Sequence, residues 1–594
     1  MMNIEIEEYL KRQLDGETPK DWKKEYPIDK KILRAFKDIV TKSDVVFVAG
    51  DYDADGICSS LILKKGLREL FPEKTITALL PDRFRDGYGM NKNQIDKIAN
   101  VLKQMEDRGK GFKNPCIITC DNGTACREVF DYAKKKIPGI ATIVTDHHLP
   151  TILPGQELSD VLPEVDLLCN PHINGFSYTE YCGAGVALRL MESLNDSDHV
   201  KPLMDELRIY AGIATVADMV EMKKDNWVIT RTSLDLMKEG LEKHTLPPAL
   251  DLLFASLNIV DKSQINEGFY GFTLGPLFNA MGRLENYGAN KVLKFLDSKV
   301  PSQDMCDYLI ENNQTRKSIV NEVSAELFKK RGIMEHEGIK PIWLMLPDKP
   351  MDIKDENGVV THTIDRVAEE GLCGLYATKI VERTGAPAIV LTPSRVDPAI
   401  LKGSGRSIPG FNLHKYLSEV ASPYLLGFGG HQEACGLSCD MKGLKELSKL
   451  SNLYDTEPFL IPEEEQEERP LFFSSLPDMV EDYKELQAEY APFGMGYNAP
   501  LYAVECNSAI QEFHTMGNGK HFWTKQDNVK IVHFNHENAE ISNKEHFYLT
   551  GQISENYYLG MTTYQFLANE ACDSLEREQE LENEMGDEDF ADLG

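Results

Sequence analysis

The sequence predicts an α/β fold whose first domain is built on a parallel sheet. The main support is a set of three short apolar runs rich in β-branched residues, at positions 45–49, 116–120 and 140–144, each of which leads into a polar cluster. Such runs are typical of buried parallel strands. Open α/β sheets bind their ligands at the carboxyl ends of the strands. The three polar clusters are therefore expected to lie together at one edge of the sheet.

The polar clusters are rich in acids and histidines. In chain order they contain Asp51, Asp53, Asp55, Asp121, Asp146, His147 and His148. Like charges that converge repel one another unless a cation neutralises them, so the pattern predicts a metal site. A single Asp after a strand is more often a helix N-cap or a turn residue. Alternating aspartates at 51, 53 and 55 are a poor match to a cap, which favours the metal site.

Composition and charge indicate a multidomain protein of the cytoplasm. The chain has 594 residues, which is more than a single core usually supports, and 42% of them are hydrophobic. It contains neither an apolar run of about 18 residues, as a membrane span needs, nor the layout of a signal peptide at its start. The cysteines form no CxxC pairs and are expected to be small core residues of a reducing compartment.

The formal net charge of −31 argues against a protein that binds nucleic acid, which usually has a basic surface. The distribution of the charge weakens this argument. Residues 570–594 hold eleven acids against Arg577 alone, and 463–468 form a second acidic run. Such blocks usually mark solvated linkers and tails. Residues 571–594 are therefore expected to be a disordered tail.

The first half of the chain contains further candidate ligands. Residues 57–70 have helical periodicity, and the start of this helix would face the carboxylates. The loop 81–89 carries Arg83, which is suited to a phosphate, although a solvated turn is the alternative. Residues 181–186 form a glycine turn that is only a weak phosphate loop. Asp218 interrupts an apolar helix and is either a further metal ligand or a buried acid paired with a base.

The second half predicts a second lobe and a barrel. Residues 274–284 are expected to be a loop in which glycines hold Asn279 and Arg283, and 290–331 a long helix between two lobes. Residues 403–407 are predicted to be a glycine loop whose amides, hydroxyls and guanidinium form an anion cradle. The glycine-rich segment 427–436 presents His431. Short aromatic strands in 471–570 suggest a small barrel, either an OB-fold that binds nucleic acid or a structural barrel.

Together these motifs resemble those of the DHH phosphoesterase superfamily and, within it, the RecJ-type exonucleases, which degrade single-stranded DNA in the 5′→3′ direction. Residues 51–56, 121–123 and 146–148 resemble the first three motifs, and Asp218 resembles the fourth. Residues 279–283 are similar to the NAxGR element. Residues 403–407 and 429–436 are similar to the DHH-associated domain, and 491–494 introduce an OB-like domain.

The resemblance implies a specific domain order. It consists of an N-terminal helical segment (1–44), a DHH-type parallel-sheet catalytic domain (45–289), a long connecting helix (290–335), a second α/β, DHH-associated substrate-binding domain (336–455), a C-terminal OB-like β-barrel (456–570) and the acidic tail (571–594). Single-stranded DNA is the implied substrate of a monomer that acts away from membranes. A single-strand-binding protein or a helicase is a candidate partner.

The resemblance also implies the site residues. Two divalent metal ions, Mn²⁺ or Mg²⁺, would be held by Asp51, Asp53, Asp55, Asp121, His147, His148 and Asp218, with Asp146, His147 and His148 as the catalytic motif. Substrate would be bound by Arg83, Asn279, Arg283, Ser404, Arg406, Ser407 and His431. Mixed imidazole and carboxylate ligands favour Mn²⁺ over Mg²⁺.

Two other functions share parts of this pattern. A smaller superfamily member would cleave pyrophosphate, short oligonucleotides or cyclic dinucleotides, but such substrates need neither a spacer helix nor a barrel. A non-catalytic replication scaffold would be expected to have lost metal ligands, and here none of the motif residues is missing.

Overall fold

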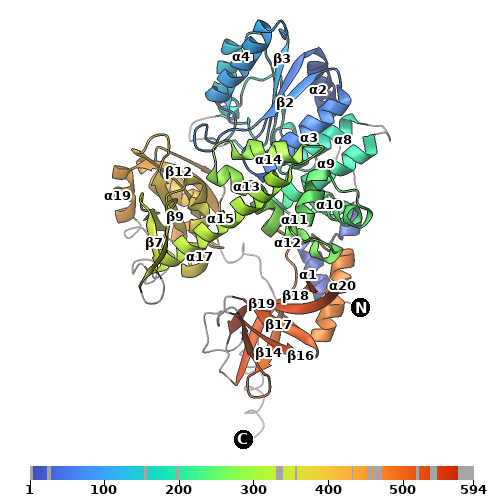
Figure 1. Ribbon diagram of the computed structural model, residues 1–594, viewed down its shortest axis with the longest axis vertical. Helices are drawn as coiled ribbons and strands as arrows, with labels where there is room; N and C mark the ends of the chain where they lie inside the picture. The colour runs from blue at the N-terminus through green and yellow to red at the C-terminus, as the bar shows by residue number, and fades with distance from the viewer. Residues whose placement is uncertain are drawn as a thin grey trace, which may run out of the picture.

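The computed structural model contains two α/β lobes and a C-terminal β domain (Figure 1). It describes residues 4–22, 28–150, 152, 157–195, 200–329, 339–354, 358–430, 432–450, 457–460, 471–516, 521–534, 545–558 and 560–572. Among these residues no helix is both long enough and apolar enough to cross a membrane.

The first lobe is built on a five-stranded parallel sheet. Its strands are β1 (Val45–Ala49), β2 (Thr75–Leu79), β3 (Pro115–Cys120), β4 (Ala141–Thr145) and β5 (Leu167–Cys169), in the order β2-β1-β3-β4-β5. The three strands expected from the apolar runs are β1, β3 and β4, and they lie side by side. Parallel neighbours end at the same edge of a sheet, so the prediction that their polar clusters meet is confirmed.

The helices of the first lobe lie around this sheet and below it (Figure 1). They are α2 (Lys30–Lys42), α3 (Ala54–Leu70), α4 (Lys92–Asp107), α5 (Arg127–Lys136), α6 (Leu158–Val161), α7 (Pro171–Asn174), α8 (Gly183–Leu194), α9 (Lys201–Ala217), α10 (Lys224–Lys243), α11 (Pro248–Ser256), α12 (Glu267–Phe269), α13 (Gly275–Leu284) and α14 (Gly288–Leu296). Helix α3 is buried along most of its length. Gly66 allows it to approach α8, because a Cβ there would lie 2.5 Å from the sulfur of Met191.

Residues 274–284 are helical rather than the loop that their glycines suggested. A π-helical turn, η4 (Tyr270–Leu274), leads directly into α13. The glycines serve close packing: a Cβ at Gly282 would lie 2.9 Å from the carbonyl oxygen of Tyr52, and one at Gly275 would lie 2.9 Å from the Cβ of Ala217. Helix α13 is thereby held against the loop that follows β1.

The connection between the lobes contains two helices instead of one. Helix α14 ends at Leu296, and α15 (Gln303–Phe328) begins after Ser302, whose side chain caps it. Pro301 lies in the intervening segment, where a proline disfavours helical geometry in the residue before it. Residues 330–335 of the predicted helix lie outside the described residues.

The second lobe contains a mixed sheet. Its strands are β6 (Ile342–Met345), β9 (Ala388–Pro393), β10 (Ile400–Arg406), β11 (Gly427–Gly430) and β12 (Ala434–Asp440), in the order β11-β12-β10-β9-β6, with the hairpin β7 (Met351–Lys354) and β8 (Val360–Ile364) beside it. Its helices include α17 (Cys373–Thr384), α18 (Leu413–Tyr416) and α19 (Met441–Leu450).

The predicted glycine loop at 403–407 is mostly strand, because β10 extends to Arg406. Gly403 allows β10 to pair closely with β9: a Cβ there would lie 1.9 Å from the carbonyl oxygen of Val390. The glycine pattern that suggested a loop thus reflects strand packing. The side chains of Ser404 and Arg406, two residues apart on one strand, share a face of the sheet.

The C-terminal β domain contains a seven-stranded sheet. Its strands are β13 (Leu471–Phe473), β14 (Leu501–Asn507), β15 (His514–Met516), β16 (His521–Gln526), β17 (Val529–His533), β18 (His546–Tyr558) and β19 (Met561–Cys572), in the order β13-β14-β18-β19-β17-β16-β15. Helix α20 (Leu476–Glu489) packs on it. The short strands expected in this region are therefore present.

The N-terminal segment divides between two units. Helix α1 (Ile4–Gln13) and the turn η1 (Pro19–Trp22) contribute to the core of the β domain, whereas α2 packs in the first lobe. Figure 1 shows α1, at the blue end of the chain, beside α20 and β18 near its red end. Trp22 is 2% exposed, and its ring lies 5.8 Å from that of Trp227 on α10 and 6.3 Å from that of Tyr497. It therefore joins the first lobe to the β domain.

We predict that Trp22→Ala lowers the free energy of unfolding by about 3–5 kcal/mol, because it leaves a large cavity at a buried aromatic contact. Urea titration followed by circular dichroism would measure the loss. Val300→Ala is the control, since Val300 is 87% exposed and its truncation should change stability by less than about 0.5 kcal/mol. An equally small effect of Trp22→Ala would show that the N-terminal segment does not hold the two units together.

Candidate metal centre

The carboxyl ends of β1, β3 and β4 bring three buried carboxylates together. Asp121 and Asp146 follow β3 and β4 directly, Asp51 follows β1 after Gly50, and each of the three is at most 2% exposed. Asp51 accepts a hydrogen bond from the Gly89 N–H at 3.0 Å through Oδ1, whereas its buried Oδ2 has no hydrogen-bond partner among the described residues. A buried carboxylate oxygen without a partner is costly, and a bound cation would compensate for it.

Asp53 and Asp55 are held by helix N-termini. Asp53 is the N-cap of α3 and accepts from the Gly56 N–H at 3.0 Å, so the expectation that these aspartates cap poorly is wrong for Asp53. Asp55 accepts from the N–H groups of Gly183 and Ala184, at 2.6 and 2.7 Å, at the start of α8. The glycine turn considered as a phosphate loop therefore binds a carboxylate of the protein itself.

Asp121 has an unusual backbone. Its φ of 59° is left-handed, which is uncommon for a residue other than glycine, although Asp and Asn adopt it more readily than most. A Cβ at Gly183 would lie 2.5 Å from the Cβ of Asp121, so only a glycine in α8 leaves room for this conformation. The carboxylate Oδ1 lies 3.2 Å from Nε2 of His147. Local strain at a buried acid of this kind is typical of a functional site.

Asp146 orients the two histidines. Its side chain accepts from the backbone N–H groups of His147 and Thr124, at 2.8 and 2.9 Å, and contacts Nδ1 of His148 at 2.9 Å. Although burial opposes ionisation, these bonds hold the pKa of Asp146 below its usual range. Burial also opposes the imidazolium form, but the bond to Asp146 outweighs it and raises the pKa of His148 to about 9. A metal ion would have to displace that proton.

Asp218 joins the cluster from α9. It is the residue directly after the last residue of the helix, Ala217, rather than an interruption within it. A helix C-terminus disfavours an anion, so this acid gains nothing from its local structure. Among the described residues its only ion-pair contact is His147, with Nε2 3.8 Å from Oδ2. Asp218 therefore lies with the other candidate ligands and is not paired with a lysine or arginine.

The arrangement fits metal ions. The ligand atoms form three overlapping sets, each within 4.8 Å: Asp121, His147 and His148; Asp55, His147 and Asp218; and Asp51, Asp53 and Asp121. Asp121 and His147 each belong to two sets. The carboxylate of Asp121 has two oxygens and could serve neighbouring ions, whereas a neutral imidazole has one acceptor nitrogen and could serve only one. Burial and then the neighbouring carboxylates raise the pKa of Asp51 and Asp121, and raise that of Asp55 to about 6. Divalent cations would relieve this repulsion.

A cavity of about 210 Å³ adjoins the carboxylates. Its lining includes the acids Asp51, Asp53, Asp55 and Asp218, and facing residues Arg83, Asn279, Arg283, Ser404 and Arg406 from both lobes. The Asn279 side chain accepts from the Ala54 N–H at 2.7 Å, so it positions the start of α3.

The three arginines in this cavity are not paired with acids among the described residues. Arg83 lies over the ring of Tyr52 at 4.6 Å, Arg283 donates to the Gly371 carbonyl at 2.9 Å, and Arg406 donates to the Gly405 carbonyl at 2.8 Å. Burial and the nearby guanidinium of Arg83 lower the pKa of Arg283 to about 9. Guanidinium groups that lack an acid partner are suited to a multiply charged anion.

Comparison with known proteins gives a consistent result. Residues 45–216 match the DHH family, N-terminal domain; residues 356–454 match the DHHA1 domain; and residues 475–570 match the RecJ OB domain. The chain belongs to the DHH family and is of the RecJ type.

Two relatives that this RecJ-type chain matches are themselves named RecJ. The chain is 29% identical to the single-stranded-DNA-specific exonuclease RecJ of Bacillus subtilis, and the match covers 82% of this chain and 55% of that protein. It is also 29% identical to the single-stranded-DNA-specific exonuclease RecJ of Salmonella typhimurium, and that match covers 77% of this chain and 74% of the relative. Its fold is similar to that of RecJ from Thermus thermophilus, solved in complex with Mn²⁺, with a TM-score of 0.70 at 19% identity, over 96% of this chain and 76% of that one. The chain thus spans about half the length of the Bacillus relative.

One residue that was expected to bind substrate, Ser407, does not line this cavity. The Ser407 hydroxyl donates to the Phe411 carbonyl at 2.6 Å. His431 lies outside the described residues. Sequence reasoning also missed Tyr88, which lines the cavity, donates to the Asp121 carbonyl at 3.0 Å and lies 3.1 Å from Nε2 of His148. The glycines on either side of Tyr88, both with positive φ, were the signal that it is held in place.

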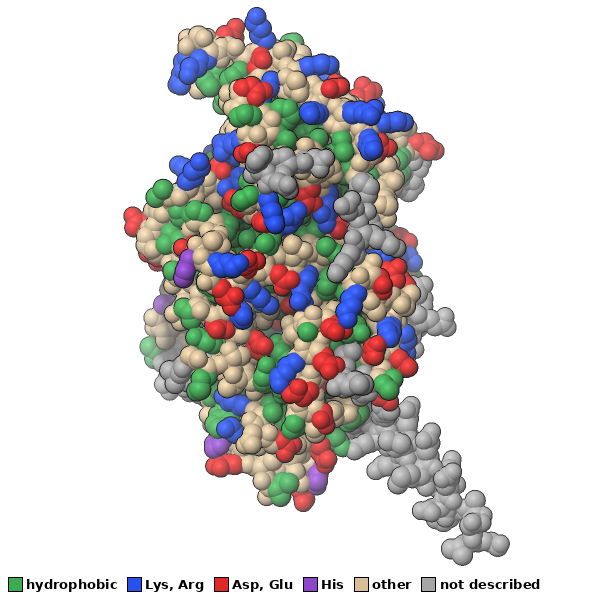
Figure 2. All heavy atoms as spheres, turned by 90° about the vertical axis from the view of Figure 1, so that its right-hand side faces the viewer, with side chains coloured by type: hydrophobic (Ala, Val, Ile, Leu, Met, Phe, Trp, Pro, Cys, Tyr) green, Lys and Arg blue, Asp and Glu red, His purple; other side chains and the backbone are tan. Residues whose placement is uncertain are grey.

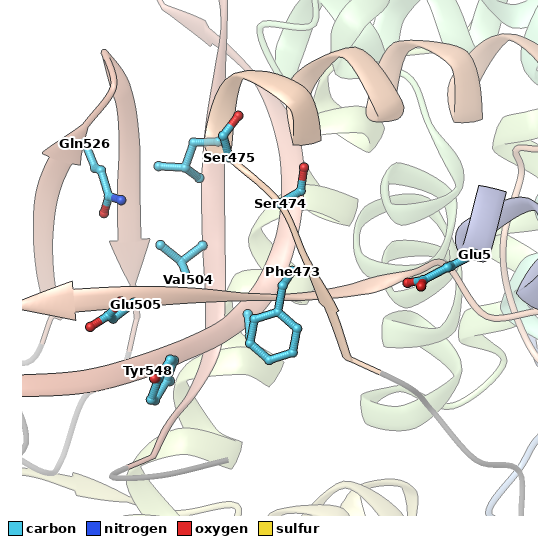
Figure 3. Close-up of a pocket in the computed structure, with 10 residues that line it drawn as sticks. Glu5, Phe473, Ser474, Ser475, Val504, Glu505, Gln526 and Tyr548 are labelled. Atoms are coloured by element: carbon cyan, nitrogen blue, oxygen red, sulfur yellow. The ribbon is translucent and has the colours of Figure 1, made fainter. Parts of the chain in front are cut away.

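Another cavity, of about 600 Å³, has different chemistry. It lies on the C-terminal β domain, and Figure 3 shows Phe473, Glu505 and Tyr548 around it, with Glu5 of α1 at its side. Neither a lysine nor an arginine is among its lining residues. It therefore lacks the cations that a phosphate site needs.

Positive charge is concentrated locally in the DHH protein. On the face shown in Figure 2, Lys and Arg side chains are intermingled with Asp and Glu side chains. The cluster of arginines without acid partners in the cavity is therefore a feature of the cleft and does not reflect the net charge of the chain, which is −31.

We predict that Mn²⁺ raises the thermal transition temperature, and that the increase grows from pH 5 to pH 7.5. Without metal, carboxyls with a raised pKa retain protons in the folded state that the unfolded chain has released. Stability therefore falls as pH rises from about 4 through the folded pKa of Asp55, about 6. A cation removes this loss. Differential scanning fluorimetry would measure the transition temperature with and without Mn²⁺ at each pH. Asp304→Asn, on the exposed first turn of α15, is the control. An increase that does not depend on pH would contradict the assignment of these carboxyls as ligands.

Proposed function

We propose that the protein is a metal-dependent exonuclease that hydrolyses phosphodiester bonds of single-stranded DNA from the 5′ end. The observation that carries the proposal is one cavity in which carboxylates of the metal cluster lie together with three arginines that have no acid partner among the described residues. The first group suits cations, and the second suits a phosphate. A substrate that carries two phosphates a short distance apart would satisfy both.

The residues of the cluster have separable roles. Two divalent cations, Mn²⁺ or Mg²⁺, held by Asp51, Asp53, Asp55, Asp121, His147, His148 and Asp218, would activate water and stabilise the charge that develops on the phosphodiester. Asp146 keeps the histidine rings oriented through its bonds to their backbone and to Nδ1 of His148. Tyr88 adds a hydroxyl beside His148 and restricts the same ring.

The arginines would bind the terminal phosphate. Arg83 and Arg283 come from the first lobe, and Arg406 and Ser404 come from β10 of the second. Helix α17 contributes Gly374 from its first turn, where a Cβ would lie 2.9 Å from Nη2 of Arg406, so glycine leaves space for the guanidinium. A terminal phosphate carries more charge than an internal one, and planar guanidiniums can each hold two of its oxygens. This end of the cavity would stop the strand one step beyond the metals.

Single-stranded DNA fits better than the alternatives. The cavity of about 210 Å³ is bordered by both lobes, so it suits a single strand more than a duplex. Pyrophosphate or a cyclic dinucleotide would not require the separate β domain, in which Lys530 lies over Trp523 and Trp523 stacks on His514. Aromatic and basic side chains on a β domain are typical of single-strand binding. A non-catalytic scaffold is disfavoured because each predicted metal ligand lies in the cluster.

The cellular setting is part of the same proposal. The enzyme would act as a monomer in the cytoplasm, in DNA repair or recombination. A single-strand-binding protein or a helicase would supply its substrate.

Incubation of the protein with Mn²⁺ and single-stranded DNA labelled at the 5′ or 3′ end tests the proposal. We expect 5′-labelled strands to release the label as the first short product, while 3′-labelled strands shorten progressively. Duplex DNA of the same sequence should be cut much more slowly. Loss of the 3′ label first would contradict the proposed polarity, and no cleavage of any strand would contradict the activity.

We predict that Asp121→Asn lowers kcat on single-stranded DNA by about 1,000-fold or more, roughly 4 kcal/mol of barrier. Asn adopts the left-handed backbone conformation of residue 121 readily, so the fold should remain intact. Rates with saturating Mn²⁺ and circular dichroism spectra would be compared with those of the wild type. A folded variant with near wild-type turnover would remove Asp121 from the mechanism.

We predict that Arg406→Ala weakens the use of 5′-phosphorylated strands more than that of 5′-hydroxyl strands. The measurement is the ratio of kcat/KM on matched oligonucleotides, which should fall by about tenfold, the equivalent of one charge-assisted contact. Ser407→Ala is the matched control, because the neighbouring hydroxyl is bonded to Phe411. An unchanged ratio, with both substrates slowed alike, would mean that Arg406 has only a structural role.

A further inference from the structure

The loop that joins β2 to α4 carries two residues of the cavity. Residues 81–89 include Arg83 and Tyr88. Asp82 is fully buried and organises the loop: its side chain accepts from the N–H groups of Phe84 and Tyr287, at 3.0 and 2.9 Å. The loop is therefore rigid on the side of the first lobe.

The tip of this loop also contacts the second lobe. Phe84 is 1% exposed, and the guanidinium carbon of Arg395 lies 3.8 Å from the centre of its ring. Arg395 follows β9, and its backbone N–H donates to Oε1 of Glu370 at 2.6 Å. A guanidinium stacked on a buried ring is a favourable contact that lysine only partly reproduces.

The contact continues back to the first lobe through a buried acid. Glu369 is 5% exposed and is paired with Arg395, and its Oε1 accepts from Nε of Arg366 at 2.6 Å. Arg366 in turn donates to the carbonyl of Leu284, the last residue of α13. Arg395, Glu369 and Arg366, here called the lobe bridge, thus bind the first lobe at two separate points.

The lobe bridge lies next to the end-binding arginines. Arg283 immediately precedes Leu284 and donates to the carbonyl of Gly371. A Cβ at Gly371 would lie 2.3 Å from the Arg283 carbonyl oxygen, so the two lobes touch backbone to backbone here. Three residues further on, Gly374 lies against Arg406. The segment 366–374 therefore connects Phe84 and α13 to the residues that would hold the terminal phosphate.

We infer that the lobe bridge is a positioning device that holds Ser404 and Arg406 of the second lobe at a fixed distance from the metal centre and so sets how many nucleotides each cut removes. The inference rests on the proposed function. The metal ligands come from the first lobe, whereas Ser404 and Arg406 come from the second, so the distance between them depends on how the lobes are joined. A misplacement of roughly 1 Å can cost about 100-fold in rate.

The test compares Arg395→Ala with the wild type on 5′-phosphorylated single strands with Mn²⁺. Products are separated by length, and kcat/KM is measured on 5′-phosphoryl and 5′-hydroxyl strands. We expect the wild type to release products of one length. Arg395→Ala should release mixed lengths, and its preference for the 5′-phosphoryl strand should fall by about tenfold or more. Arg395→Lys keeps a cation over Phe84 and opposite Glu369. It should partly restore both the single product length and the preference for the 5′-phosphoryl strand.

Lys379→Ala is the matched control, because it removes an exposed ion pair with Glu382 on α17 of the same lobe. It should leave product length and substrate preference unchanged. If Arg395→Ala does not fold, Phe84→Leu provides the same comparison, since it removes the ring face and keeps an apolar side chain. One product length and an unchanged preference in a folded bridge variant would overturn the inference. Failure of the wild type to degrade single-stranded DNA would instead overturn the proposed function.

Discussion

The structure of the site depends on the repulsion among carboxylates gathered at one edge of a buried sheet. Parallel strands β1, β3 and β4 end side by side, so the acids that follow them are brought together whatever their charge. Burial removes the water that would screen them, and the pKa of several of these groups is raised as a result. The repulsion among these carboxylates must be offset by positive charge, and divalent cations supply that charge most directly.

The surrounding elements compensate part of this charge and also aim the ligands. Backbone N–H groups at the start of α8 hold Asp55, and that of Gly56 in α3 holds Asp53. The closeness of α8 requires Gly183, since any side chain there would collide with Asp121. Helix N-termini that could have bound a substrate phosphate are thus used for the ligands, and phosphate binding is left to arginines.

The division of charge between the lobes explains how an acidic chain can be suited to a polyanion. The metal ligands come from the first lobe, and the arginines without acid partners lie where the two lobes meet. Lys and Arg side chains elsewhere are mixed with acids, as Figure 2 shows for one face. The cleft could therefore attract a polyanion despite the net charge of the chain. The contacts of the second lobe with α13 and with the loop 81–89 are consequently as important as the acids themselves.

The sequence by itself determined the three central strands of the first sheet and the acids and histidines that gather at their ends, because strand periodicity and the placement of acids after strands are local patterns. It misjudged the glycines at 275, 282 and 403, since a glycine that allows close packing has the same local signature as one that forms a loop. Only the tertiary structure revealed that α1 belongs with the β domain and that Ser407 is bonded to Phe411. It also revealed that Arg395 stacks on Phe84. These contacts join residues that are distant in sequence or depend on which face a side chain takes, and no local pattern encodes them.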